Sequence, residues 1–141
     1  ALYLAAILHD IGAAVGEVMH REYSYRIILQ HREELDAACS CRVAEEGAEI
    51  ARHHGVENQI PQTVDRGTAI AIAIMRVADG LDYTANQTMK RIETSLTDNT
   101  LTIYAHCQQN TEDCKRCIER AQEKSILLSK LLKTNITIKT R

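Results

Sequence analysis

The chain has a single proline, Pro61, in 141 residues, and this scarcity narrows its possible folds. Only six glycines accompany it, so the two residue types that form most tight turns are rare. An all-β protein needs a turn every eight to twelve residues or so, which this composition does not supply. Phe and Trp are absent, so Ala, Ile, Leu and Val must fill the core. We therefore expect a mainly helical protein.

Apolar residues at helical spacing cover most of the first ninety positions. The spacing predicts helices over residues 1–9, 17–29 and 68–83. A further helix is expected to begin after Ser40 as its N-cap, to run into His53 and His54, and to end with Gly55 as its C′ residue.

The pattern changes after residue 90. Residues 91–96 and 101–105 alternate around a turn-like segment, Thr97–Thr100, which predicts a β-hairpin. Helical spacing returns over 112–133, and 136–138 reads as a short last strand. We expect one domain, with a helical body over 1–90 and a small hairpin–helix–strand α+β cap over 91–141.

Charge and cysteine content limit the partners and the compartment. The net charge is -2, so no global field attracts duplex nucleic acid or a membrane, and a local cluster or a metal must hold any anionic substrate. The longest apolar run, residues 69–75, falls far short of the roughly 20 residues that cross a bilayer. Five cysteines, an odd number, favour reduced thiols in a cytoplasmic protein. The abrupt helical start suggests that a natural N-terminal segment precedes residue 1.

A set of histidines and aspartates falls at the ends and edges of the apolar helical stretches. Its members are His9, Asp10, His20, His53, His54 and Asp79. Imidazoles and carboxylates are ligands of divalent metals, and six such groups exceed the need of one tetrahedral zinc. They suit a pair of octahedral ions, which lie roughly 3.5–4 Å apart in two-metal sites.

This set and its flanking residues resemble the HD-domain metal-dependent phosphohydrolases. Within that superfamily the spacing is most similar to the C-terminal helical domain of exopolyphosphatase/guanosine pentaphosphatase (Ppx/GppA) proteins. The likeness covers nearly the whole chain. The segments that carry it are Leu8-His9-Asp10-Ile11-Gly12, His20 with Ser24 and Ile27-Ile28, Ile50-Ala51-Arg52-His53-His54, and Arg76-Val77-Ala78-Asp79-Gly80-Leu81-Asp82.

The resemblance implies roles for particular residues. His9, Asp10 and Asp79 would be core metal ligands, and His20, His53 and His54 would be those that some members use for a second ion. One or two divalent ions (Mn, Fe, Mg, Ni or Zn) would activate water against a phosphate ester or phosphoanhydride, in a nucleotide or polyphosphate. Asp10 and Arg76 would be catalytic, and the substrate-binding residues would be Arg52, Arg76, Lys90 and Arg91.

Two departures from the family pattern support a second hypothesis. The family often has Lys where this chain has Ala13, and it has a further His upstream of the His-Asp pair. The alternative is a non-catalytic module that binds polyphosphate or a nucleotide and forms dimers, for which the apolar last helix is the expected contact.

Simpler interpretations also stay open at this point. The His-Asp pair can make ordinary helix-end hydrogen bonds, and Asp79 can be a helix cap or an ion-pair partner of Arg76. The two cysteine pairs, Cys39-x-Cys41 and Cys114-x-x-Cys117, can form a thiolate metal site on paper, although both fall within helical patterns.

Overall fold

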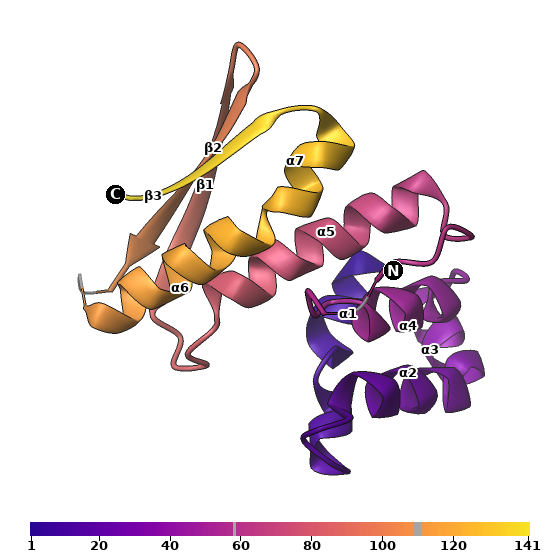
Figure 1. Cartoon of the computed structure of the whole chain (residues 1–141). Coiled ribbons are helices and arrows are strands. Elements are labelled where there is room, and N and C mark those ends of the chain that lie inside the picture. The colour runs from indigo at the N-terminus through magenta and orange to yellow at the C-terminus, as the bar shows by residue number, and fades with distance from the viewer. Residues whose placement is uncertain (58, 109–110) are drawn as a thin grey trace. The chain divides into compact units, whose positions relative to one another are not determined.

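A computed structural model describes residues 1–57, 59–108 and 111–141, which form two compact units, 1–75 and 76–141 (Figure 1). The first unit contains α1 (Leu2–Leu8), a short 3-10 helix η1 (Ile11–Ala14), α2 (His20–Gln30), α3 (Arg32–Cys39) and α4 (Ala44–Arg52). Helix α5 (Arg66–Leu81) contributes residues to both units. The second unit adds β1 (Met89–Thr97), β2 (Thr100–Cys107), α6 (Glu112–Lys124), α7 (Ile126–Leu132) and β3 (Asn135–Thr140).

Small and branched residues hold the helices of the first unit together. Ala44, Ala48 and Ala51 on α4 are fully buried against Leu4 of α1 and Ile28 of α2. Alanine stripes let helices approach closely, because no long side chain separates their backbones. A second cluster joins Ala5 and Ile50 to the α5 residues Ile72 and Met75. These two clusters fix α1, α2 and α4, whose ends carry the predicted ligands.

The N-terminus of α4 is capped from the preceding helix. One carboxylate oxygen of Asp36 on α3 accepts hydrogen bonds from the backbone N–H groups of Val43 and Ala44, at 2.8 and 2.9 Å. The expected N-cap, Ser40, is instead the left-handed C-cap of α3, with φ 54°. The prediction for Ser40 was wrong because Asp36, seven residues upstream of Val43, satisfies the free N–H groups of this helix start.

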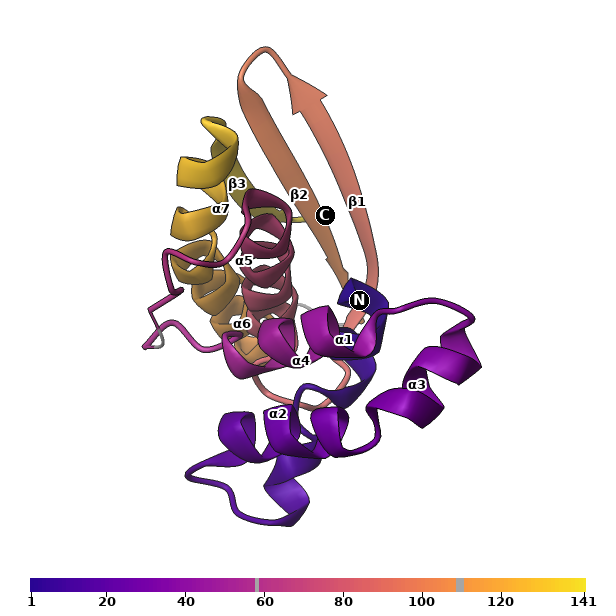
Figure 2. The same cartoon turned by 90° about the vertical axis from the view of Figure 1, so that its right-hand side faces the viewer.

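The second unit is a three-stranded sheet with two helices on one face (Figures 1 and 2). β1 pairs antiparallel with β2, and the hairpin turns through Asp98 and Asn99, with Thr97 opposite Thr100. β3 pairs with β2 in parallel, which the crossover through α6 and α7 allows. The sheet is tied to α6 by Gln122, whose side chain donates to the Ile136 carbonyl and accepts from the Ile138 N–H.

The observed elements agree with the expected class, a helical domain followed by a small α+β portion. Two details differ from the sequence prediction. The single helix expected over 112–133 is two helices, which meet at Ser125, where the hydroxyl donates to the Gln122 carbonyl. Gly55 does not act as a C′ residue, because α4 ends at Arg52 and Gly55 has no positive φ. Instead, a Cβ at Gly55 would collide with the Arg21 guanidinium.

The prediction of reduced thiols is wrong for two of the cysteines. Cys107 at the end of β2 and Cys114 in α6 form a disulfide, while Cys117 is a buried free thiol. The four-thiolate alternative is therefore wrong for this state of the protein, because Cys114 has no thiolate to offer. Among the described helices, none has the length and apolarity needed to cross a bilayer.

Candidate functional site

Three segments of the first unit meet at the carboxylate of Asp10. This residue is the N-cap of η1 and follows His9, the C-cap of α1. His20 is the first residue of α2, and His54 lies two residues beyond the end of α4. One Asp10 oxygen lies 3.4 Å from Nε2 of His20 and 3.5 Å from Nε2 of His54, and the other lies 3.3 Å from Nε2 of His9.

Gly12 and Ser24 bring η1 and α2 together. The backbone N–H of Gly12 donates to the buried hydroxyl of Ser24 at 2.9 Å. A Cβ at Gly12 would collide with the carbonyl oxygen of His20 and the amide nitrogen of Ser24. Glycine at this position therefore allows the close approach that places His20 beside Asp10.

Each of the three imidazoles is oriented by a backbone carbonyl three residues upstream. Nδ1 of His9, His20 and His54 lies 3.1, 2.8 and 2.6 Å from the carbonyl oxygens of residues 6, 17 and 51. A carbonyl only accepts hydrogen bonds, so we assign the proton of each neutral ring to Nδ1, which leaves a lone pair on Nε2. Metal-binding histidines are commonly oriented in this way, because the outer hydrogen bond fixes the tautomer and the ring angle.

The three Nε2 atoms face the Asp10 carboxylate, which, like them, can only accept hydrogen bonds. His20 and His54 present their Nε2 atoms to each other at 3.4 Å, and the His9 and His54 rings meet edge to face, with centroids 5.0 Å apart. Lone pairs that face one another at these distances repel, unless a cation lies among them. Protonation of a ring would relieve some of this repulsion, but one carboxylate cannot pair fully with three imidazolium ions. A divalent metal satisfies all the donors together.

Burial and charge also favour a cation here. His54 has 4% of its side chain exposed and Asp10 has 55%, so the cluster has a buried wall and an open side. The pKa of Asp10 lies below its ordinary value, because the hydrogen bond that His9 donates when its ring is protonated, and the charges of protonated His9, His54 and His20, outweigh the opposite effect of burial. Asp10 therefore stays ionised, as a metal ligand must.

Among the described residues, one group of histidine, cysteine, aspartate and glutamate side chains has its donor atoms close enough to share an ion. It consists of Asp10, His20 and His54, whose donor atoms all lie within 4.8 Å of one another. His53, the neighbour of His54, is turned elsewhere: its Nε2 lies 3.4 Å from a carboxylate oxygen of Glu49. Adjacent residues at a helix end point in different directions, so only one of this pair joins the group.

Asp79 belongs to the second unit, where its carboxylate forms an ion pair with Lys124 of α6. The Lys124 side chain has only 6% of its area exposed. Gly80 lies against α6 at this point, since a Cβ on it would come within 2.7 Å of the Ala121 Cα. A metal-binding role for Asp79 stays a prediction. Its partner Lys124 could not be predicted from helical spacing.

The four basic residues predicted to bind phosphate differ from one another in their partners and burial. Arg52 pairs with Glu22 at 3.1 Å and stacks over the Tyr25 ring, 4.5 Å from its centroid. In the second unit, Arg76 is buried, while Arg91 pairs with Glu93 at 2.7 Å and Lys90 is exposed on β1.

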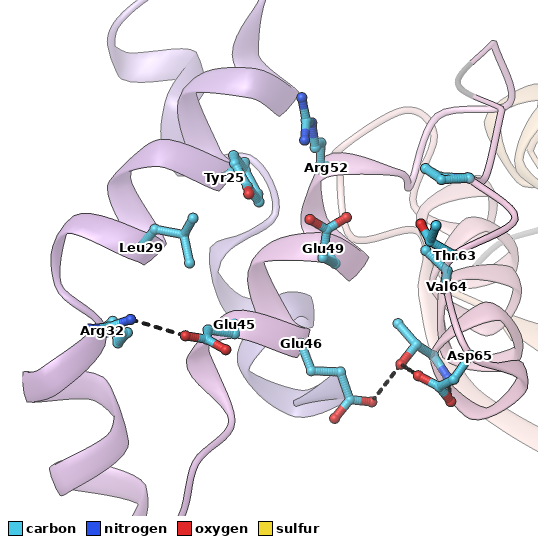
Figure 3. Close-up of a pocket in the computed structure, with 12 residues that line it drawn as sticks. Tyr25, Leu29, Arg32, Glu45, Glu46, Glu49, Arg52, Thr63, Val64 and Asp65 are labelled. Atoms are coloured by element: carbon cyan, nitrogen blue, oxygen red, sulfur yellow. Dashed lines mark hydrogen bonds and ion pairs between the residues drawn. The ribbon is translucent and has the colours of Figure 1, made fainter.

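A cavity of about 670 Å³ opens between α2, α4 and the segment before α5 (Figure 3). Figure 3 shows Glu45, Glu46 and Glu49 on α4, with Tyr25 and Leu29 on one side and Val64 and Asp65 on the other. Four carboxylates and two guanidinium groups line this cavity, a balance that disfavours a phosphate.

A second cavity, of about 610 Å³, has the opposite balance. Arginines 21, 26 and 52 line it together with Glu22 and Glu57, and so does His53. Arg21 directly follows His20 in the chain, and its guanidinium lies against Gly55, directly after His54, and 3.3 Å from Glu57. Sequence reasoning overlooked Arg21, although its position next to a proposed ligand was a usable signal.

Comparison with known proteins identifies the first part of the chain. The family model described as the HD domain matches residues 1–84. No curated protein and no solved structure matches the chain.

Proposed function

The chain belongs to the HD domain family, and on this premise we propose that it is a metal-dependent hydrolase of phosphate esters or phosphoanhydrides. The observation that carries the proposal is the convergence of three oriented Nε2 atoms on the Asp10 carboxylate. Such a donor set is typical of a site that holds a divalent cation.

The donor set fits one ion, with Asp10, His20 and His54 as its ligands and His9 beside them. Two or three imidazoles with one carboxylate suit Fe, Mn, Ni or Zn better than Mg, which prefers oxygen ligands. A bound divalent ion would supply Lewis acidity, which activates water and neutralises charge on phosphate oxygens. The open side at Asp10 leaves room for a substrate, since the aspartate side chain is more than half exposed.

For the substrate we propose a phosphorylated compound, held by Arg21 and Arg52. Both guanidinium groups line the second cavity, where arginines outnumber carboxylates by three to two. Arginine binds phosphate through two parallel hydrogen bonds, which also fixes the orientation of the group. A phosphate that displaced Glu57 from Arg21 would exchange one anionic partner for another of higher charge. We keep a catalytic role for Asp10 as the ligand that orients the ion, while roles for Arg76, Lys90 and Arg91 stay predictions.

One observation favours the alternative, a non-catalytic module that binds a nucleotide or polyphosphate, as in exopolyphosphatase-related proteins. Asp79, which the family resemblance makes a core ligand, is paired with the buried Lys124. Pairing with an ammonium group makes the Asp79 carboxylate a weaker ligand, so a site that depended on it would bind its metal more weakly.

One experiment on the purified chain distinguishes the two proposed functions. We would measure metal content, and then hydrolysis of a panel of nucleotides, a polyphosphate and a chromogenic phosphate ester with Mn²⁺, Fe²⁺, Ni²⁺ or Mg²⁺ added. His54→Gln should abolish metal retention and activity, and the matched variant His53→Gln should keep the metal, because His53 faces Glu49. Metal retention without turnover on any substrate would favour the module. Equal metal retention in the two variants would refute the proposed centre.

A further inference from the structure

One face of the sheet in the second unit is open. The helices α6 and α7 lie against the other face, where Ile103 and Ala105 of β2 and Ile138 of β3 are buried (Figure 2). Side chains alternate along a strand, so the residues between these point away from the helices. In the described part of the chain they are partly or fully exposed. We call this the outer face of the sheet, and its charged and aromatic residues are Arg91, Glu93, Tyr104, His106, Lys139 and Arg141.

Side-chain contacts show that these residues lie together. The carboxylate of Glu93 lies 2.7 Å from the guanidinium of Arg91 and 2.9 Å from that of Arg141. It also lies 3.4 Å from Nε2 of His106. Both arginine side chains are well exposed, at 69% and 63%. A guanidinium has five N–H donors, so one shared carboxylate leaves both arginines with donors for a further anion.

Positive charge exceeds negative charge on the outer face. Among its described side chains Arg91, Lys139 and Arg141 are cations, and the one carboxylate is that of Glu93. The imbalance extends to the whole unit, because residues 76–141 include eleven Lys and Arg against eight Asp and Glu. Residues 1–75 have the opposite balance, six against eleven. Such an asymmetry in a chain of net charge -2 indicates that the second unit is the part that attracts an anionic partner.

Tyr104 places an aromatic ring at the centre of this face. It lies on the middle strand, beside Glu93 of β1 and Lys139 of β3. The Arg141 guanidinium lies over the ring, 5.3 Å from its centroid. Nucleic acid bases stack on tyrosine rings and on guanidinium planes. A polymer of phosphate alone has no flat group that would use this ring.

A row of hydroxyl groups crosses the same face nearer the hairpin turn. Ser95 of β1, Thr102 of β2 and Thr137 of β3 are direct neighbours in the pairing of the strands. Hydroxyl groups donate and accept hydrogen bonds, as the 2′-OH of ribose does. The cations, the ring and the hydroxyl row therefore match the phosphates, bases and sugars of one kind of polymer.

We propose that the outer face binds single-stranded RNA. An unpaired base stacks against Tyr104 and Arg141, and the phosphates beside it contact Arg91 and Lys139. The hydroxyl row contacts ribose. Bases in a duplex are already stacked on one another, so a duplex does not use the ring. The proposal does not depend on the metal centre, which lies in the first unit.

The first test measures binding of a labelled single-stranded RNA to the full chain by fluorescence anisotropy, with EDTA present to prevent metal-dependent hydrolysis. Tyr104→Thr should weaken binding about tenfold or more, because stacking of one base on an aromatic ring contributes that much. Tyr104→Phe keeps the ring and should bind like the wild type. Lys139→Gln should weaken binding and reduce the slope of log affinity against log salt by about one, since it removes a phosphate contact.

Two control variants should bind the RNA as the wild type does. Lys115→Gln makes the same charge change as Lys139→Gln on an exposed residue of α6, which lies on the opposite side of the sheet. His54→Gln removes a proposed metal ligand in the first unit. Loss of RNA binding in either control would overturn the outer face as the binding surface.

The second test compares ligands that share phosphates with the RNA and differ in the rest. Duplex RNA, inorganic polyphosphate and phosphatidylserine vesicles should each compete weakly with the labelled strand at equal phosphate concentration. The matching DNA strand should bind more weakly, because it lacks the 2′-OH groups.

Three results would overturn the proposal. The first is competition by polyphosphate or duplex as strong as that by single-stranded RNA, or equal binding of the DNA strand. The second is equal RNA binding by the wild type and Tyr104→Thr, or equal losses in Tyr104→Thr and Tyr104→Phe. The third is vesicle binding that depends on Lys139 without any RNA binding, which would assign the face to a membrane.

Discussion

The Nε2 atoms of His20 and His54 lie 3.4 Å apart, and the same oxygen of Asp10 faces both of them. Because each ring has its Nδ1 against a backbone carbonyl, neither Nε2 carries a proton in the neutral ring. The cluster therefore gathers lone pairs and negative charge, an arrangement that a bound cation would stabilise.

A divalent ion should stabilise the folded chain. At a free metal concentration about 100 times the dissociation constant, linkage predicts a gain of about 2.7 kcal/mol in the free energy of unfolding. We expect this gain for the wild type and for His53→Gln, and its loss in His54→Gln, when thermal unfolding is followed with and without Mn²⁺ or Ni²⁺. A gain of equal size in all three proteins would place the ion elsewhere.

Gly12 sets the distance between η1 and α2, so Gly12→Ala should damage both stability and metal binding. The new methyl group would collide with backbone atoms of His20 and Ser24, which cannot move without shifting the start of α2. Overpacking of this kind costs about 1–3 kcal/mol. Urea unfolding measures the loss, and metal titration should show weaker binding.

Gly16→Ala is the control for that variant. A Cβ at Gly16 would lie 3.0 Å from an edge carbon of the Tyr23 ring, which can move aside. It should therefore cost much less than Gly12→Ala. Similar losses in the two variants would mean that the tight contact at Gly12 has no special importance.

Much of the fold could be predicted, because the signals were local. Helical spacing over residues 1–9 and 68–83 and alternation around residues 97–100 depend on neighbours in the chain, and the structure has helices and a hairpin there. The histidines were found in the same way, since His9 and His54 lie at the ends of helices that apolar spacing predicts and His20 lies within another.

The parts that could not be predicted depend on distant partners. Asp36 caps α4 from another helix, so the N-cap was sought at Ser40. Asp79 pairs with Lys124, 45 residues away, and no local pattern connects them. His53 and His54 are adjacent and chemically alike, so the sequence does not show which of them is a ligand. The direction in which α4 ends decides it, because it turns His53 toward Glu49 and His54 toward Asp10.

The ion pair of Asp79 and Lys124 should be structural whether or not a metal is present. Removing the carboxylate leaves the ammonium of a lysine that is only 6% exposed without this charge partner, and losing one member of a buried pair typically costs about 3–5 kcal/mol. We expect a loss near the lower end of that range for Asp79→Ala, because the Asp79 side chain is 23% exposed. Chemical unfolding in the presence of a chelator measures it.

A matched double variant, Asp79→Leu with Lys124→Met, should recover much of this loss, because it replaces both charges with apolar groups of similar size. If Asp79→Ala unfolds like the wild type in chelator and differs from it only when metal is added, the main role of Asp79 is that of a ligand.

The cap that Asp36 provides should make the stability of the first unit depend on pH. The backbone N–H groups of Ala44 and Val43 lower the pKa of Asp36 below its ordinary value of 3.8. A carboxyl group with a lowered pKa in the folded state stabilises that state fully above the unfolded value, and the stabilisation disappears as the pH falls through the folded pKa. Asp36→Ala should therefore be less stable than the wild type at pH 6, and the difference should shrink as the pH falls below about 3.8. Thermal unfolding of both proteins across this range measures the effect, with Glu33→Ala on the same helix as the control. A difference that stayed constant down to the lowest pH would show that Asp36 does not cap α4 as a carboxylate.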